Sequence, residues 1–189
     1  MSHRQTPSQT VGPFFRPSLL EDGSENLIRE VTRGERVTIE GRVLDGDGAP
    51  VTDAMLEIWQ ANAEGKYDHP EDDQEKLLDP HFHGHGRSGT DATGAYHFHT
   101  IRPGPLPDAA GGVQAPHINL SIFARGLLKR LVTRIYFPDE PLNKTDAVLN
   151  AVPAQRRGTM IAEWTDANHR VLRFDVILQG ARETVFLDI

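Results

Sequence analysis

The sequence predicts an all-β protein, a two-layer antiparallel β-sandwich with long loops and an extended N-terminal arm. Short segments rich in β-branched and aromatic residues alternate polar and apolar positions, as half-buried strands do. Clusters of Gly, Pro and Asp separate these segments and predict turns. The chain has no alternation of strands with helices and no glycine-rich phosphate loop, so a doubly wound nucleotide-binding fold is not expected.

The first strand is expected at residues 36–45, RVTIEGRVLD, because Val37, Ile39 and Val43 share one face and the turn GDGAP follows. Seven later segments have the same character, and eight strands joined by turns are typical of a sandwich. The seven are residues 54–60, 94–101, 117–124, 131–137, 158–164, 169–179 and 183–189.

Helical character is confined to LNKTDAVLNAV, residues 142–152, where Thr145 or Asp146 is the candidate cap. Two long irregular segments, 62–94 and 102–116, interrupt the strands. Loops of such length in a compact domain usually build a site or an interface, so both are candidate functional segments.

Residues 1–30 are expected to form an extended arm. Pro7, Pro13 and Pro17 favour extended backbone there. An extended arm has no core of its own, so we expect a partner to hold it.

Composition bounds the function classes. With 189 residues and 21.0 kDa, the chain is expected to form one domain over residues 1–189. A formal net charge of -7 argues against nucleic-acid binding, which needs a basic surface. The absence of cysteine excludes disulfides and zinc thiolate sites. The N-terminus has no apolar signal region, and no apolar run reaches the ~18 residues of a membrane span, so a cytoplasmic protein is expected.

Nine histidines raise the question of a metal site. In HFHGHG, His81, His83 and His85 recur at every second position, and a strand there would project all three rings from one face. Gly84 and Gly86 favour a loop instead. An autonomous metalloenzyme that uses these three histidines stays an alternative.

The segment HFH, residues 97–99, lies in a sequence with a clearer strand pattern than HFHGHG. Tyr96 and Phe98 are its natural core residues, so His97 and His99 are expected to face outward into solvent.

The segment HINLSIF begins a predicted strand with a potential metal ligand. Because strand side chains alternate, His117 and Asn119 share one face while Ile118, Leu120 and Ile122 share the other. A histidine and an amide therefore point the same way.

The segment IEGRVLDGDGAPVTDAMLEIWQANAEGKY resembles, over its whole length, the signature segment of the intradiol ring-cleaving dioxygenases. IRPGPLP and APHINLSIF follow in the order of that family, and the arm TPSQTVGPFF and the tail RFDVILQGARETVFLDI extend the resemblance to nearly the full chain. The resemblance implies a β-sandwich enzyme that opens catechol rings with O2 and Fe(III). The chain is more similar to the alpha than to the beta subunits of the members that cleave protocatechuate to 3-carboxy-cis,cis-muconate.

In iron-binding members of the family, two tyrosines and two histidines hold Fe(III), a hard cation suited to phenolate and imidazole ligands. Tyr67 matches the first tyrosine and His117 the first histidine. Leu106 stands at the second tyrosine position and Asn119 at the second histidine position. The resemblance thus implies a vestigial site without metal, and Fe(III) on a homologous beta subunit.

The resemblance also implies that this chain helps to line the partner's substrate pocket through Thr10, Gly12, Pro13 and Arg134. A guanidinium suits the carboxylate of protocatechuate through charge-assisted hydrogen bonds. Without the resemblance, Arg134 would be interpreted as a strand arginine in a surface ion pair. Gly12 would be interpreted as a turn residue in a flexible arm.

A third interpretation is a binding or structural module. GRVLDGDGAPVTDAMLEIW also resembles transthyretin-like and adhesin-type sandwiches, whose strands carry no catalysis. The arm, the tail and PHINLSIFARG count against it, because a generic sandwich needs none of them.

Overall fold

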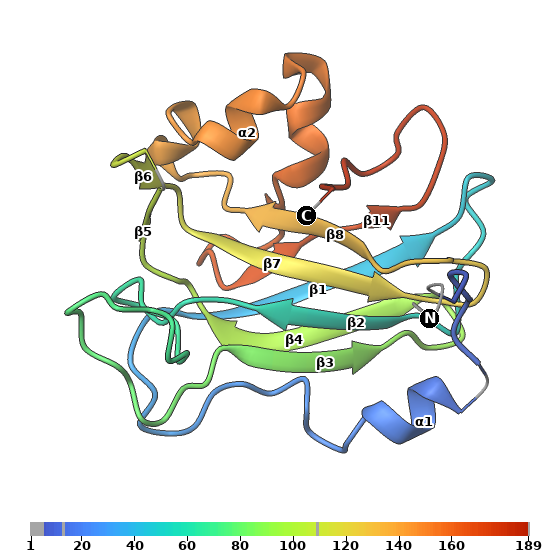
Figure 1. The fold of residues 1–189 in the computed structure, drawn as a ribbon, viewed down its shortest axis with the longest axis horizontal. Helices are drawn as coiled ribbons and strands as arrows, with labels where there is room; N and C mark the ends of the chain where they lie inside the picture. Colours follow the sequence, from blue (N-terminus) through green and yellow to red (C-terminus); the bar gives the residue numbers. More distant parts are fainter. Residues whose placement is uncertain (1–5, 13, 109, 189) are drawn as a thin grey trace, which may run out of the picture.

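The computed structural model describes residues 6–12, 14–108 and 110–188. Its strands form two stacked sheets (Figure 1) and one small hairpin. The first sheet contains β1 (Arg36–Leu44), β4 (Ala95–Ile101), β9 (Glu163–Trp164), β10 (Val171–Arg173) and β11 (Val176–Ile177). The second has the order β3 (His85–Gly89), β2 (Met55–Trp59), β7 (His117–Phe123) and β8 (Leu131–Tyr136). The hairpin pairs β5 (Leu106–Pro107) with β6 (Val113–Gln114).

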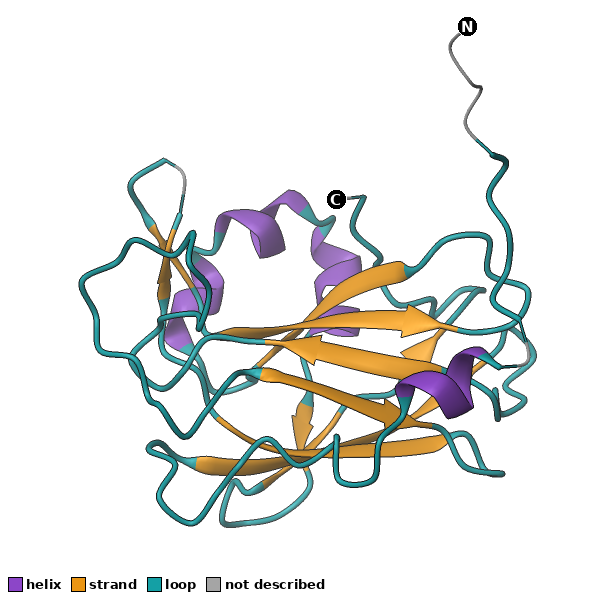
Figure 2. Ribbon diagram, turned by 60° about the horizontal axis from the view of Figure 1, so that its bottom comes forward, coloured by secondary structure: helices purple, strands orange, loops and turns teal. Residues whose placement is uncertain are grey.

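Helical segments are short and lie outside the sheets (Figure 2). None of those in the described part of the chain is long and apolar enough to cross a bilayer. They are α1 (Phe15–Leu19), α2 (Ala147–Ala151) and two 3₁₀ helices, η1 (Pro141–Lys144) and η2 (Ala154–Met160).

The core lies between the two sheets and follows the strand alternation of the sequence. From β1, Val37, Ile39 and Val43 are buried, as predicted. From β7, Ile118 and Leu120 face them and belong to the same cluster. The predicted β-sandwich is therefore confirmed.

Strand pairing is mixed rather than wholly antiparallel. β1 pairs antiparallel with β4 on one side and parallel with β10 and β11 on the other. The second sheet is antiparallel throughout. The alternation of residues along a strand carries no information on the direction of its neighbour, so the sequence did not reveal the parallel pairs.

The strand expected at 158–164 was wrong for most of its length. The 3₁₀ helix η2 occupies 154–160, Ile161 forms an isolated bridge with Tyr136, and only β9 is a strand. Pro153 starts the helix, and Met160 at its end is buried in a second, smaller core beside β8. Burial of Met160 outweighs the weak strand pattern, because packing overrides local propensity.

The strand expected at 183–189 was also wrong over its described residues, which run to 188 and hold no strand. The Thr184 amide donates to the carbonyl of Ile177 in β11, whereas the Leu187 amide donates to that of Val132 in β8. The tail crosses from one sheet to the other, so neither sheet supplies a ladder.

The segment 62–94 was expected to be irregular, yet it contains β3. Gly86 and Gly89 weaken the strand pattern in the sequence. Close packing against the N-terminal segment explains why glycine stands at both positions. A Cβ at Gly86 would overlap Leu27, and one at Gly89 would overlap Leu20. The glycines let residues 20–27 lie directly on the outer strand.

The helix expected within 142–152 is confirmed as α2, and Asp146 is its cap. The Asp146 carboxylate accepts a hydrogen bond from the Leu149 amide at 2.8 Å. This carboxylate is fully buried, and its other partners belong to the site described below.

The side chain of Tyr96 connects β4 to the segment between β10 and β11, on the other side of β1. Its hydroxyl donates to the carbonyl oxygen of Phe174 at 2.6 Å. Gly41, opposite Tyr96 on β1, makes this possible, because a Cβ there would overlap the Phe174 carbonyl and crowd the tyrosine ring.

Gly41→Ala should therefore lower the free energy of unfolding by about 3 kcal/mol, measured by urea denaturation. Gly158→Ala is the matched control, because a Cβ at Gly158 meets no atom within 4 Å. It should change stability by less than about 0.5 kcal/mol. Equal stability of the two variants would show that the close approach at Gly41 does not constrain the sheet.

Candidate functional site

The outer face of the second sheet carries a row of side chains at one level. Trp59 of β2 is paired with Asn119 of β7, and Asn119 is paired with Arg134 of β8. His117 lies two residues before Asn119 on the same face, opposite Tyr136. Three strands thus bring together residues that are up to 77 positions apart in the sequence.

Tyr67 reaches this row from the loop that follows β2. Its ring stacks on Trp59 with 5.8 Å between centroids and 8° between planes. Its hydroxyl accepts a hydrogen bond from Asn119 Nδ2 at 3.0 Å. Burial raises the pKa of Tyr67, so the phenol stays protonated at neutral pH.

A tight turn before Tyr67 sets its position. The Asn62 side chain accepts from the amides of Glu64 and Lys66, both at 3.0 Å. Gly65 has φ +78, and a Cβ there would overlap the carbonyl oxygen of Pro105. Only glycine fits this left-handed and crowded position.

Leu106 enters the site from the hairpin of β5 and β6. It pairs with Gln114 and is nearly buried. Its side chain has no hydrogen-bonding or metal-binding atom.

His117 is 1% exposed. Its Nδ1 donates to the carbonyl oxygen of Ala115 at 2.7 Å, which fixes the neutral tautomer. Burial, aided by the positive charge of Arg134, lowers the pKa of His117 to about 4. His117 is therefore neutral at neutral pH.

A buried carboxylate underlies the site. Asp146 accepts from the Tyr136 hydroxyl at 3.0 Å and from the Ala115 amide at 2.9 Å, in addition to its helix-capping bond. Burial raises the pKa of Tyr136. The sequence identified Asp146 only as a cap, and nothing in its spacing pointed to Tyr136 or Ala115.

Arg134 is half-buried in this arrangement. Its Nη1 donates to Gln114 Oε1 at 2.9 Å. Its Nε is buried and has no partner among the residues that the structure describes. The surface ion pair expected in the absence of a family resemblance does not appear among its contacts there.

Thr10 and Gly12 lie elsewhere. Thr10 Oγ1 accepts from the Gly126 amide at 2.7 Å, just beyond the far end of β7, and the Gly12 carbonyl accepts from the Phe15 amide at 3.2 Å. A strand rises ~3.3 Å per residue, so Thr10 lies on the order of 16 Å or more along β7 from Asn119. Pro13 lies outside the described residues.

These residues do not fit ferric iron in the manner that the family resemblance implies. Leu106 offers no ligand atom. Asn119 turns an N–H toward Tyr67, and an N–H donor cannot coordinate a cation. Tyr67 and His117 remain as ligand types, and both have protein partners.

The three histidines of HFHGHG have separate surroundings. His83 Nδ1 lies 2.7 Å from Asp68, and His85 Nε2 lies 3.4 Å from Glu57. The His81 amide donates to Asp79. Across the described ranges, no three His, Cys, Asp or Glu side chains are grouped so that they could hold a metal ion.

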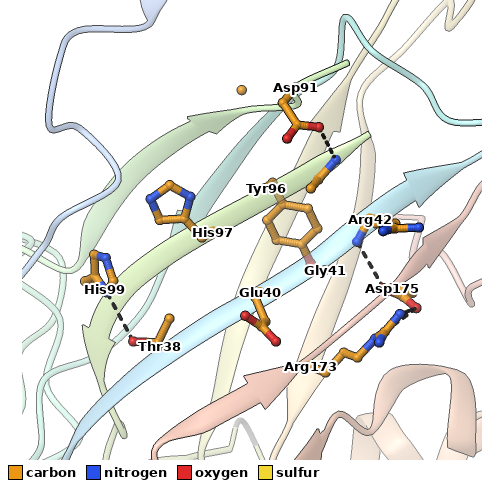
Figure 3. A pocket seen from close by; sticks show the side chains of 12 residues that line it. Thr38, Glu40, Gly41, Arg42, Asp91, Tyr96, His97, His99, Arg173 and Asp175 are labelled. Atoms are coloured by element: carbon orange, nitrogen blue, oxygen red, sulfur yellow. Dashed lines mark hydrogen bonds and ion pairs between the residues drawn. The ribbon is translucent and has the colours of Figure 1, made fainter. Parts of the chain in front are cut away.

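A hollow of about 640 Å³ lies on the outer face of the first sheet (Figure 3). His97 and His99 project into it from β4, which confirms that both face outward. His97 is exposed, whereas His99 is half-buried and lies 3.1 Å from the Thr38 hydroxyl through Nδ1. The lining mixes both signs of charge, including Glu40 and Arg173.

Comparisons with known proteins agree with this architecture. A family model described as Dioxygenase matches residues 11–180. The chain belongs to this dioxygenase family. The family resemblance drawn from the sequence is thus confirmed.

Two relatives are similar over much of the chain. The chain is 40% identical to the protocatechuate 3,4-dioxygenase alpha chain of Burkholderia cepacia, over 98% of each chain. It is also 40% identical to the beta chain of that enzyme from the same organism, over 80% of this chain and 67% of the relative. Among solved structures, the dioxygenase domain of a carbohydrate-binding fusion protein from Streptomyces sp. SirexAA-E is 30% identical, with a TM-score of 0.66 over 94% of this chain and 100% of that one.

The low pKa of His117 predicts a pH dependence of stability. Unfolded histidine binds a proton below pH 6.5, while folded His117 stays neutral down to about pH 4. The unfolded state then holds more protons, so about 3 kcal/mol of stability is present above pH 6.5 and is lost as pH falls toward 4. Urea denaturation of the native chain and of His117→Gln between pH 4 and 7 measures this contribution.

In His117→Gln, the slope of stability against pH should fall by an amount that corresponds to at most one proton. An unaltered slope in His117→Gln would mean that His117 binds its proton over the same pH range in the folded and the unfolded chain, which contradicts a lowered pKa.

Proposed function

We propose that this chain is the alpha subunit of a protocatechuate 3,4-dioxygenase, which cleaves protocatechuate with O2 to 3-carboxy-cis,cis-muconate. In this proposal, Fe(III) is held by a homologous beta subunit. Near full-length identity of 40% to alpha chains from Burkholderia cepacia and Pseudomonas putida supports the assignment. The similarity to a beta chain supports a homologous beta chain as the partner.

One observation supports the placement of the iron on the partner rather than on this chain. At the two positions where the family resemblance places a phenolate and an imidazole, this chain has Leu106 and Asn119, and Asn119 donates to Tyr67. A chain with this arrangement needs a partner to supply the iron.

What this chain contributes is binding of the substrate from outside the iron site. Arg134 carries a positive charge and a buried Nε without a described partner, which suits a substrate carboxylate. Thr10, Gly12 and Pro13 belong to the arm. Since Thr10 lies far from Arg134 along β7, we propose that the arm moves onto the partner when the subunits assemble, so that both regions reach the partner's pocket.

Co-expression with a beta chain tests the assignment. The two chains should co-purify and consume O2 in the presence of protocatechuate, and each chain expressed alone should be inactive. Activity of the alpha chain alone would contradict the proposal, and so would a complex that forms but consumes no O2.

Arg134→Gln in the assembled enzyme should reduce kcat/KM for protocatechuate by about 10–100-fold, mainly through KM, because a charge-assisted hydrogen bond is lost. Iron content should stay unchanged. The loss should be much smaller for catechol, which has no carboxylate, and this selectivity separates substrate binding from a structural effect.

Arg173→Gln is the matched control. Arg173 is also a strand arginine, but it lies in the first sheet, away from Arg134, and forms an ion pair with Asp175. It should leave kcat/KM unaltered. Equal kinetics of Arg134→Gln and the native enzyme would remove Arg134 from the pocket.

A further inference from the structure

Two histidine rings lie side by side on the outer face of the first sheet. His97 and His99 are two positions apart on β4 and project into the hollow of about 640 Å³ (Figure 3). Their ring centroids are 5.4 Å apart. Two positions along a strand span about 6.6 Å, so the rings lean toward each other. Neither the core nor the proposed subunit role uses this pair.

The distance between the rings suits one shared cation. Zinc is held by imidazole nitrogens at about 2.0–2.1 Å, and two rings on the same ion then have centroids roughly 5 Å apart. The planes of the two rings meet at 61°, so the rings are not stacked face to face. Imidazole is a ligand type that suits zinc, copper and nickel.

The position of His99 is fixed by its neighbours. Its amide donates to the Glu25 carbonyl and its carbonyl accepts from the Leu27 amide, both at 2.9 Å, while β1 pairs with the other edge of β4. Its Nδ1 lies 3.1 Å from the Thr38 hydroxyl oxygen. When Nδ1 carries the proton and donates to Thr38, Nε2 keeps a lone pair for a cation. Histidines that bind metals usually have such an oxygen partner on the second ring nitrogen.

His97 and the charges near it are compatible with a cation. His97 is exposed, so its ring can turn a nitrogen toward His99 without disturbing the core. Glu40 is paired with His97 across the ladder and lines the same hollow, and its negative charge attracts a cation. Arg173 also lines the hollow, but an ion pair with Asp175 at 3.0 Å offsets part of its charge.

We propose that His97 and His99 together bind one divalent transition-metal ion of the zinc, copper or nickel class. No third His, Cys, Asp or Glu of the described ranges is grouped with them, so water completes the coordination. The pair lies on the first sheet, whereas Tyr67 and His117 belong to the face of the second. The site therefore depends neither on iron nor on the proposed subunit function, and either proposal can fail without the other.

Isothermal titration of the untagged full chain with zinc chloride at neutral pH tests the proposal. Every protein in the comparison carries His3→Gln, which removes a histidine that lies outside the described residues. Zinc should bind with a dissociation constant below about 0.1 mM. Combined replacement of both histidines, His97→Gln with His99→Gln, should remove one equivalent of bound zinc.

The matched control is His83→Gln with His85→Gln. These histidines are also two positions apart, but their rings lie beside Asp68 and Glu57. The control should keep the equivalent of zinc that the other double variant loses. Loss of the same equivalent in both double variants would contradict the assignment to His97 and His99.

Thr38→Val keeps the shape of the side chain and removes the partner of His99 Nδ1. It should weaken zinc binding by about tenfold, because loss of such a partner lowers metal affinity. Loose association of zinc with surface histidines would not respond to this change.

A measurement on the His3→Gln chain with no further substitution decides the matter should a variant not fold. Zinc should shift the ring NMR signals of His97 and His99 together and leave those of His169, which is also exposed, unmoved. The proposal is overturned if zinc does not bind, if the two rings do not respond, or if Thr38→Val binds zinc as tightly as the chain with Thr38.

Discussion

The antiparallel pairing of β7 with β2 and β8 is the constraint on which the site depends. It aligns Trp59, Asn119 and Arg134 on the outer face of one sheet while Ile118 and Leu120 fill the core. A shift of one residue would turn the apolar set outward and bury the polar one. The apolar contacts of the core therefore fix which polar side chains meet outside it.

Hydrogen bonds between protein groups satisfy most of this polar face, with the buried Nε of Arg134 as an exception among the described residues. Asn119 donates to Tyr67, His117 donates to the Ala115 carbonyl, and the buried Asp146 accepts from Tyr136. Buried polar groups need such partners, since an unsatisfied one costs about 1–3 kcal/mol. The network stabilises the loops around the site. Burial, rather than these hydrogen bonds, keeps Tyr67 protonated and His117 neutral.

Much of the sandwich could be predicted because strand alternation is a local property. The faces of residues 117–123 and the outward direction of His97 follow from period two alone. Long-range properties were missed. Asp146 was recognised as a cap because capping is local, whereas its bonds to Tyr136 and Ala115 depend on the meeting of distant segments.

In the irregular segments, too, local properties could be predicted and long-range contacts could not. The glycines of β3 weaken its pattern, and only the packing of Leu20 and Leu27 explains them. The tail at 183–188 has strand composition but two different neighbours, which no local pattern reveals. For the site, Tyr67, Leu106, His117 and Asn119 were named through a resemblance, and the structure adds their contacts.

Metal analysis of this chain, expressed alone in iron-supplemented medium, tests the central claim most directly, namely that protein hydrogen bonds have taken the place of a metal between Tyr67 and His117. The account predicts a colourless protein with no stoichiometric iron, and iron only in preparations that contain the beta partner. One tightly bound, coloured Fe(III) per chain in the absence of the partner would contradict it.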